Sequence, residues 1–263
     1  MMIKDIIKLD PGMTAVIGSG GKTSLIRRLA AEICMDESND RSGIEKAKAP
    51  GFGINNSGAS GTTTVVCTTT RILRPDDMPV FETGAGSAFD SMPELEEFIA
   101  LNSGRAVCVG VTDPHDTKKL ISFPIEMIER AAGKNSYILI EADGAKHMPM
   151  KAHNENEPVI PANCERVILV IGAEGFGKPV GMVVHRPEIF AELAQVSTNE
   201  IVTPRLLAKV LTAEREKFGA GRLQVFVNRT GLYEDNADAE LLAELTGWEV
   251  YAGCAREGTA VRC

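Results

Sequence analysis

The residues with the clearest chemistry are Gly18-Ser19-Gly20-Gly21-Lys22-Thr23, which follow an apolar run at 13–17 and precede a helical pattern that begins near Ser24. Glycines let backbone N–H groups face an anion, and the N-terminus of the next helix adds the positive end of its dipole. We expect Lys22 to reach the β- and γ-phosphates of a nucleotide and the Thr23 hydroxyl to hold Mg²⁺. Residues 18–24 are therefore the predicted phosphate-binding loop.

This loop departs from the full phosphate-loop pattern at one position. The pattern has a glycine five residues before the glycine of Gly-Lys-Thr, and here that position is Val16. The shorter form G-x-x-G-K-T remains, and its alternative interpretation is a glycine-rich turn with a surface lysine. The flanking residues favour phosphate binding, because apolar residues follow it at helical spacing. They are Leu25, Ile26, Leu29, Ala30 and Ile33.

Two acids end a second apolar run. Residues 137–141 predict a strand, and Glu141-Ala142-Asp143-Gly144 closes it. Phosphate-loop enzymes place the carboxylate that organises Mg²⁺ and the attacking water after such a strand. The period of two of a strand would project Glu141 and Asp143 to the same side. We expect one to order the metal and the other the water; the alternative is an exposed acidic turn.

Two further polar groups follow predicted strands. The hydroxyls of Thr68, Thr69 and Thr70 could reach Mg²⁺, its waters or a γ-phosphate, although threonine also simply favours strands. Asn228 follows a strand at 223–227, where guanine-nucleotide proteins carry Asn-Lys-x-Asp. Arginine and glycine occupy the lysine and aspartate positions here. Guanine selectivity is therefore left open, and Asn228 is a candidate contact to a base.

Two separate segments carry basic side chains that could bind a ligand. Lys146 and Lys151 follow the acids and could bind an anionic ligand. His185 and Arg186 follow a glycine-rich loop and precede a predicted helix at 187–195, and this segment could build a pocket for a second ligand. The alternatives are that the lysines are solvated and that His185 packs at the start of the helix.

These residues require a sheet that brings strand ends together. Predicted strands and helices alternate along the chain. The predicted strands are 13–17, 64–68, 106–111, 137–141, 166–171, 223–227 and 248–252. The predicted helices are 24–35, 91–101, 124–132, 187–195 and 237–245, and another helix opens at Thr203-Pro204. Ser91 and Thr203 are expected to cap their helices. The alternation predicts an α/β fold, with three layers and a mostly parallel central sheet covered by helices on both faces. Ligands bind at the carboxyl ends of such strands.

We expect one domain over residues 1–263, interrupted by a flexible insertion at 36–61 that is rich in Ser, Asn and Gly.

Composition narrows the classes of partner. The 263 residues carry a net charge of −8, with 44% hydrophobic and 24% charged residues. An acidic chain argues against a nucleic-acid partner, and no apolar run is long enough to cross a membrane. The N-terminus lacks the apolar core of a signal peptide. Six cysteines without metal or disulfide spacing favour a cytoplasmic location. Cys67 and Cys108 are expected to be buried, and Cys164 and Cys254 to lie in loops.

Together these blocks resemble the selenium-dependent molybdenum-hydroxylase accessory protein family, also called the YqeC-type selenium cofactor biosynthesis proteins. The resemblance covers nearly the whole chain. Its motifs are residues 17–24, Thr68-Thr69-Thr70, Glu141-Ala142-Asp143-Gly144-Ala145-Lys146, Lys151-Ala152, Glu157-Pro158-Val159-Ile160-Pro161 and His185-Arg186-Pro187-Glu188. Arg71, where family members often have histidine, and the segment 36–61 depart from the family pattern. More distantly, Glu141-x-x-Gly144 is similar to nucleotide-hydrolysing metal-delivery proteins.

The resemblance implies a phosphate-loop NTPase fold and a role in maturing a selenium-containing molybdenum enzyme. Its expected partners are a nucleotide and a molybdenum hydroxylase, the cofactor of that enzyme, or a selenium donor. We expect Lys22, Glu141 and Asp143 to be catalytic, with Thr23, Asp143 and Glu141 holding Mg²⁺. Two alternatives stay open. One is an ATP-dependent small-molecule ligase or kinase, since similar short loops occur in amide ligases, and the other is a nucleotide-dependent binding module without turnover.

Overall fold

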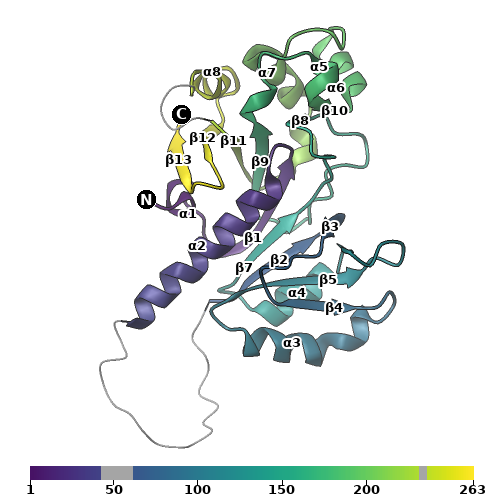
Figure 1. Ribbon diagram of the computed structural model, residues 1–263, viewed down its shortest axis with the longest axis vertical. Coiled ribbons are helices and arrows are strands. Elements are labelled where there is room, and N and C mark those ends of the chain that lie inside the picture. The colour runs from purple at the N-terminus through teal and green to yellow at the C-terminus, as the bar shows by residue number, and fades with distance from the viewer. Residues whose placement is uncertain (43–61, 231–235) are drawn as a thin grey trace, which may run out of the picture.

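One large sheet forms the centre of the protein. The computed structural model describes residues 1–42, 62–230 and 236–263. Within them, eleven strands pair in the order β13-β12-β11-β9-β1-β7-β2-β5-β6-β3, with β4 also on β5 (Figure 1). They are β1 (Gly12–Gly18), β2 (Thr64–Thr68), β3 (Arg71–Leu73), β4 (Val80–Thr83), β5 (Ala106–Thr112), β6 (Lys119–Ile121), β7 (Tyr137–Glu141), β9 (Arg166–Gly172), β11 (Arg222–Asn228), β12 (Glu249–Cys254) and β13 (Thr259–Arg262). A separate ribbon pairs β8 (Met150–Lys151) with β10 (Val184–His185).

The sheet is parallel through its middle and antiparallel only near its edges. Strand β1 pairs in parallel with β7 and β9, and the parallel set continues to β12 on one side and to β5 on the other. Strands β3, β6 and β13 pair antiparallel. Every residue of β9 is buried, as expected for a strand covered on both faces. The predicted mostly parallel α/β sheet is confirmed.

Helices cover both faces of the sheet. They are α1 (Ile3–Ile6), α2 (Lys22–Ser42), α3 (Met92–Leu101), α4 (Ile125–Ala132), α5 (Val180–Val183), α6 (Pro187–Ala194), α7 (Pro204–Ala213) and α8 (Ala237–Thr246), with 3₁₀ turns at Ala88–Ser91, Ala173–Gly175 and Arg215–Phe218. Helices α1 and α2 contribute to one hydrophobic core and α3 to α8 to the other. In Figure 1 the purple α2 crosses in front of β1 and extends past the sheet. The fold therefore has three layers.

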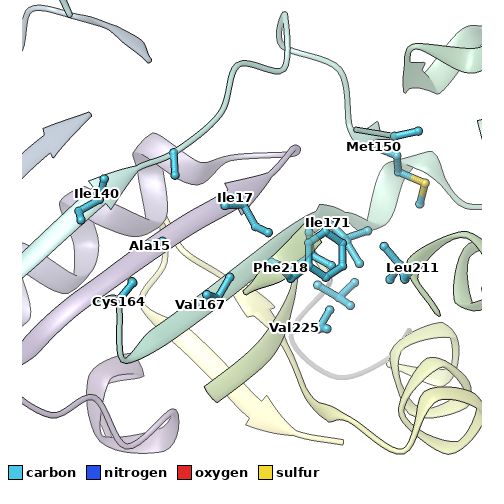
Figure 2. Packing of buried hydrophobic residues seen from close by; sticks show 14 of the residues in the cluster. Ala15, Ile17, Ile140, Met150, Cys164, Val167, Ile171, Leu211, Phe218 and Val225 are labelled. Carbon is cyan, nitrogen blue, oxygen red and sulfur yellow. The ribbon is translucent and has the colours of Figure 1, made fainter. Parts of the chain in front are cut away.

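The alternation of strand side chains explains the two cores. Val16 packs with Leu25 and Leu29 of α2. Its neighbours Ala15 and Ile17 belong to the opposite core, which Phe218 also fills (Figure 2). Successive side chains of a strand point to opposite faces, so each buried strand serves both layers. This packing holds the end of β1, and hence the glycine-rich loop, between fixed neighbours.

Several details differ from the sequence-based expectations. Helix α2 continues to Ser42, past the predicted end at residue 35, so the predicted insertion begins within a helix; its remaining part, 43–61, lies outside the described residues. Thr203 caps α7 by accepting a hydrogen bond from Leu206 N–H, as predicted. Ser91 makes no such cap, because its hydroxyl donates to the Ala88 carbonyl.

The cysteines follow the expectations only in part. Cys67 and Cys108 are buried, and burial raises the pKa of the Cys108 thiol to about 12. Cys164 lies in a loop but is buried, and its thiol contacts the carbonyls of Met13 and Arg166. Cys254 is the last residue of β12 rather than a loop residue. The buried thiols are therefore packing residues.

Candidate functional site

The glycine-rich loop joins the central strand to the longest described helix. Strand β1 ends at Gly18 and α2 begins at Lys22. Because β1 runs parallel to β7 and β9, the carboxyl ends of these strands meet at the same edge of the sheet (Figure 1). The structure thus brings the loop, the acids after β7 and the end of β9 together, as the sequence predicted.

Close backbone contacts fix the conformation of the loop. Ser19 N–H donates to the Val170 carbonyl at 2.8 Å, and Gly20 N–H donates to the Met148 carbonyl at 3.1 Å. At Gly20, where φ is +81°, an added Cβ would lie 2.2 Å from Gly172 N. The first four N–H groups of an α-helix have no partner within the helix. The start of α2 can therefore offer donors to an anion.

Lys22 is folded back over its own loop. Its ammonium group donates to the Gly18 carbonyl at 2.8 Å and lies 3.0 Å from Asp143 Oδ1. The lysine is only 5% exposed, and Asp143 is fully buried. A buried charge needs a partner of opposite sign, and each of these two residues supplies one for the other.

Asp143 is the centre of a buried ionic cluster. Its Oδ2 accepts a hydrogen bond from Gly18 N–H at 2.8 Å and lies 3.0 Å from His153 Nε2 and 3.1 Å from Lys151 Nζ. Burial alone would raise the pKa of Asp143. The charge of Lys22, the hydrogen bond with His153 and the charge of Lys151 outweigh it and hold the pKa well below its ordinary value. Asp143 is thus a stable anion beneath the loop.

His153 links this cluster to the far helices. Its Nδ1 lies 2.9 Å from Glu214 Oε2, and its backbone N–H donates to Glu214 Oε1 at 2.6 Å. Burial lowers the pKa of His153, but hydrogen bonds with Asp143 and Glu214 reverse the effect and raise it. Sequence reasoning missed Glu214, because it follows α7 in a run of charged residues that reads as solvated surface.

Thr23 and Glu141 form the pair best suited to a metal. The Thr23 hydroxyl donates to Glu141 Oε2 at 2.8 Å. Burial raises the pKa of Glu141, and the Lys22 charge and the Thr23 hydrogen bond offset this in part. Hydroxyl and carboxylate oxygens are the ligands that Mg²⁺ prefers, and it often takes its remaining ligands from phosphate and water. Among the described residues, no group of three or more His, Cys, Asp or Glu side chains could hold a metal ion.

The two acids have different partners, although both face the start of α2. Strand β7 ends at Glu141, so its alternation does not continue to Asp143. Glu141 faces Thr23 at the start of α2, whereas Asp143 lies among Lys22 and Lys151. The chemistry expected of the pair is therefore divided between two environments.

The three threonines lie at the same edge. Thr68 Oγ1 donates to the Glu141 carbonyl at 2.7 Å, and Thr70 N–H donates to Thr68 Oγ1 at 3.0 Å. The Thr69 hydroxyl donates to the Val159 carbonyl at 2.6 Å. These bonds fasten the end of β2 to the strand that carries Glu141. Arg71, which follows the threonines, pairs with Asp113 at 2.7 Å.

Asn228 braces the loop from the other side. Its amide nitrogen donates to the Gly20 carbonyl at 2.8 Å, and its amide oxygen accepts from Ala255 N–H at 3.0 Å. Asn228 is 2% exposed. Both polar atoms are thus engaged within the protein, so Asn228 positions the loop in this structure rather than presenting a free amide to a base.

A partly apolar hollow adjoins Thr23 and Glu141. Its other lining residues are Ile26, Arg27, Val66, Ile72, Leu73, Pro75 and Met78. The predicted metal position therefore borders a partly apolar surface.

Comparison with known proteins assigns the family. Residues 54–188 match the family model described as YqeC protein. The chain belongs to the YqeC family. The uncharacterized protein YqeC of Escherichia coli (strain K12) is 29% identical over 256 residues, which cover 92% of this chain and 86% of that protein. No solved structure matches. In the described part of the chain, no helix is long and apolar enough to span a membrane.

The segment that matches the family model contains only part of the candidate site. It includes the threonines after β2, the acids after β7 and the basic residues up to Arg186. The glycine-rich loop, Glu214 and Asn228 lie outside it. The contacts described above nevertheless join the two groups of residues into one site.

Proposed function

We propose that this YqeC family member binds a Mg²⁺ nucleoside triphosphate, ATP or GTP, at residues 18–24 and hydrolyses it. The observation that carries the proposal is the 2.8 Å contact between the Thr23 hydroxyl and Glu141 Oε2. It joins the first turn of α2, beside Lys22, to the carboxyl end of the neighbouring parallel strand. Phosphate-loop proteins use such a hydroxyl and acid around Mg²⁺.

Each residue has a role in this proposal. The N–H groups from Gly21 to Ser24 and the ammonium of Lys22 hold the phosphates, while the internal hydrogen bonds of the Gly18, Ser19 and Gly20 N–H groups fix the Gly18–Gly21 backbone around them. Thr23 and Glu141 hold Mg²⁺, which would neutralise charge that develops on the phosphate oxygens. Asp143 holds Lys22 until phosphate replaces it. Thr68, Thr69 and Thr70 keep the strand end in register, and in this proposal they respond to the presence of the γ-phosphate.

The biological role that we propose rests on family resemblance. The protein would use its nucleotide cycle in the maturation of a selenium-dependent molybdenum hydroxylase. It would act on the enzyme, on its cofactor or on a selenium donor. The division of the site between a nucleotide loop and neighbouring motifs that face the same edge supports an accessory protein that couples nucleotide state to a second binding event.

Calorimetric titration of the full chain with non-hydrolysable ATP and GTP analogues, with and without Mg²⁺, tests the proposal. We expect Mg²⁺-dependent binding of at least one nucleotide. Thr23→Val removes only the hydroxyl and should abolish the Mg²⁺ dependence, whereas Lys22→Ala should remove most of the affinity. Lys134→Ala, an exposed lysine before β7, is the control and should bind as the wild type.

Unchanged, Mg²⁺-dependent affinity in Lys22→Ala would overturn the assignment of the loop. A turnover assay then separates the reaction classes. Steady release of inorganic phosphate without a second substrate supports hydrolysis. ADP release that requires a carboxylate substrate would favour the ligase or kinase alternative, and binding without turnover would favour a binding module.

A further inference from the structure

Four basic side chains gather beside the phosphate-binding loop. We call Lys146, Lys151, His185 and Arg186 the basic cluster. Strands β8 and β10 pair in parallel with Lys151 opposite His185, and Figure 1 places this ribbon beside α6. Arg186 follows as the N-cap residue of α6. Lys146 comes from the loop after Asp143, close enough for its charge to act on His185.

Positive charge in the basic cluster exceeds the negative charge that contacts it. Among the residues that the structure describes, the carboxylate oxygen that faces both Lys151 Nζ, at 2.5 Å, and Arg186 Nη1, at 2.6 Å, is Glu157 Oε2. The other carboxylate near Lys151 is Asp143, which Lys22 and His153 already share. This local excess of positive charge contrasts with the net charge of −8 of the whole chain. An anionic ligand would neutralise the excess positive charge.

His185 supplies an unused donor in the basic cluster. Its Nδ1 is buried and has no hydrogen-bond partner among the described residues. Burial, with the charges of Arg186 and Lys151, lowers the pKa of His185, so the neutral ring can donate from one nitrogen. A buried polar atom without a partner destabilises the protein. A ligand oxygen would provide that partner.

The backbone around the basic cluster is held in an uncommon conformation. Lys146, His147 and Arg186 have φ values of 47°, 62° and 66°. Side-chain-bearing residues rarely adopt this left-handed region, and such strain is concentrated at functional sites. The backbone at Lys146 and at Arg186 is thus held in the left-handed conformation.

We propose that the basic cluster binds a small-molecule oxyanion, a carboxylate or phosphate group carried by a second ligand. The site is separate from the glycine-rich loop, because Asp143 stands between Lys22 and Lys151. A bound oxyanion would receive charge-assisted hydrogen bonds from Lys146 and Arg186 and a further bond from His185. This inference does not depend on nucleotide binding.

Calorimetric titration of the nucleotide-free full chain with sulfate, and separately with acetate, tests the site. We expect the wild type to bind sulfate. Arg186→Gln should weaken the affinity for sulfate about tenfold or more, because charged hydrogen bonds to the anion are lost. Arg205→Gln changes an exposed arginine of α7 and should bind as the wild type. Lys146→Gln changes an exposed residue, so it should fold normally and also bind sulfate more weakly.

The Lys22→Ala variant separates the basic cluster from the loop. If sulfate occupies the basic cluster, Lys22→Ala keeps most of the wild-type affinity even if nucleotide binding is lost. Loss of sulfate binding in Lys22→Ala with no effect in Arg186→Gln and Lys146→Gln would mean that the anion binds only to the loop and would overturn the proposal. Absence of both sulfate and acetate binding in the wild type would overturn it as well. Binding of acetate together with sulfate would point to carboxylate ligands, and binding of sulfate alone to phosphate-bearing ligands.

Discussion

At the scale of single residues, Lys22 has partners that a phosphate can replace. Its ammonium contacts the Gly18 carbonyl and Asp143. If a nucleotide draws Lys22 away, Asp143 keeps the Gly18 N–H, Lys151 and His153 as partners. The carboxylate is therefore not left as an unpaired buried charge, a situation that costs several kcal/mol, about 3–5, in other proteins. The cluster allows Lys22 to move while the rest of the site stays in place.

The pH dependence of stability should reveal His153. Its folded pKa is raised, so the folded protein binds a proton more tightly than the unfolded chain, whose histidine pKa is about 6.5. The stabilising contribution is complete below that value and is lost as the pH rises through the folded pKa. We expect the free energy of unfolding of the wild type, measured in urea, to fall over this range.

The matched variants make that measurement specific. In His153→Gln, the free energy of unfolding should decline less as the pH rises than it does in the wild type. His115→Gln changes an exposed loop position and should keep the pH slope of the wild type. Equal slopes in all three proteins would show that His153 does not carry a proton between Asp143 and Glu214.

At the scale of elements, the strand-end rule predicted which segments would meet. Apolar runs identified β1, β2, β7, β9 and β11, and parallel pairing placed their polar ends at one edge. The sequence could not reveal the partners of Asp143, since His153 and Glu214 come from irregular segments whose approach depends on tertiary packing.

Ser91 and Thr203 present similar capping signals, yet only Thr203 caps, because a 3₁₀ turn precedes α3 and redirects the Ser91 hydroxyl. The antiparallel strands β3, β6 and β13 are too short or too polar for periodicity to identify.

Gly20 is the loop position where element geometry leaves least space. A Cβ there would lie 2.2 Å from Gly172 N and 2.8 Å from the Pro149 carbonyl, both backbone atoms that cannot simply rotate away. Gly20→Ala should therefore destabilise the protein by more than the roughly 1–3 kcal/mol of left-handed strain alone. Urea unfolding measures the difference.

Gly177→Ala is the control for Gly20→Ala. Gly177 has a similar φ, +73°, but an added Cβ would have no atom within 4 Å. It should show the strain without the clash, and nucleotide affinity should fall only in Gly20→Ala. If both variants lose the same stability, the contact between the loop and the end of β9 is looser than the structure indicates.

At the scale of the whole molecule, binding and stability are coupled. A nucleotide that binds only the folded protein should raise its free energy of unfolding by about 2.7 kcal/mol at a concentration one hundred times Kd. We expect this shift with Mg²⁺ and the preferred nucleotide in thermal or urea unfolding. The nucleotide should raise the free energy of unfolding of Lys22→Ala only slightly, and that of Lys134→Ala as much as that of the wild type. A full shift in Lys22→Ala would locate the nucleotide elsewhere.

The order of the chain has a consequence for folding. The glycine-rich loop is made before its supports, since Asp143 follows Gly18 by 125 residues and Asn228 follows Gly20 by 208. Contacts so distant in sequence make folding slow. A growing chain carries the loop without Asn228 until residue 228 has been added. The proposed anion site can take its described shape only after that point.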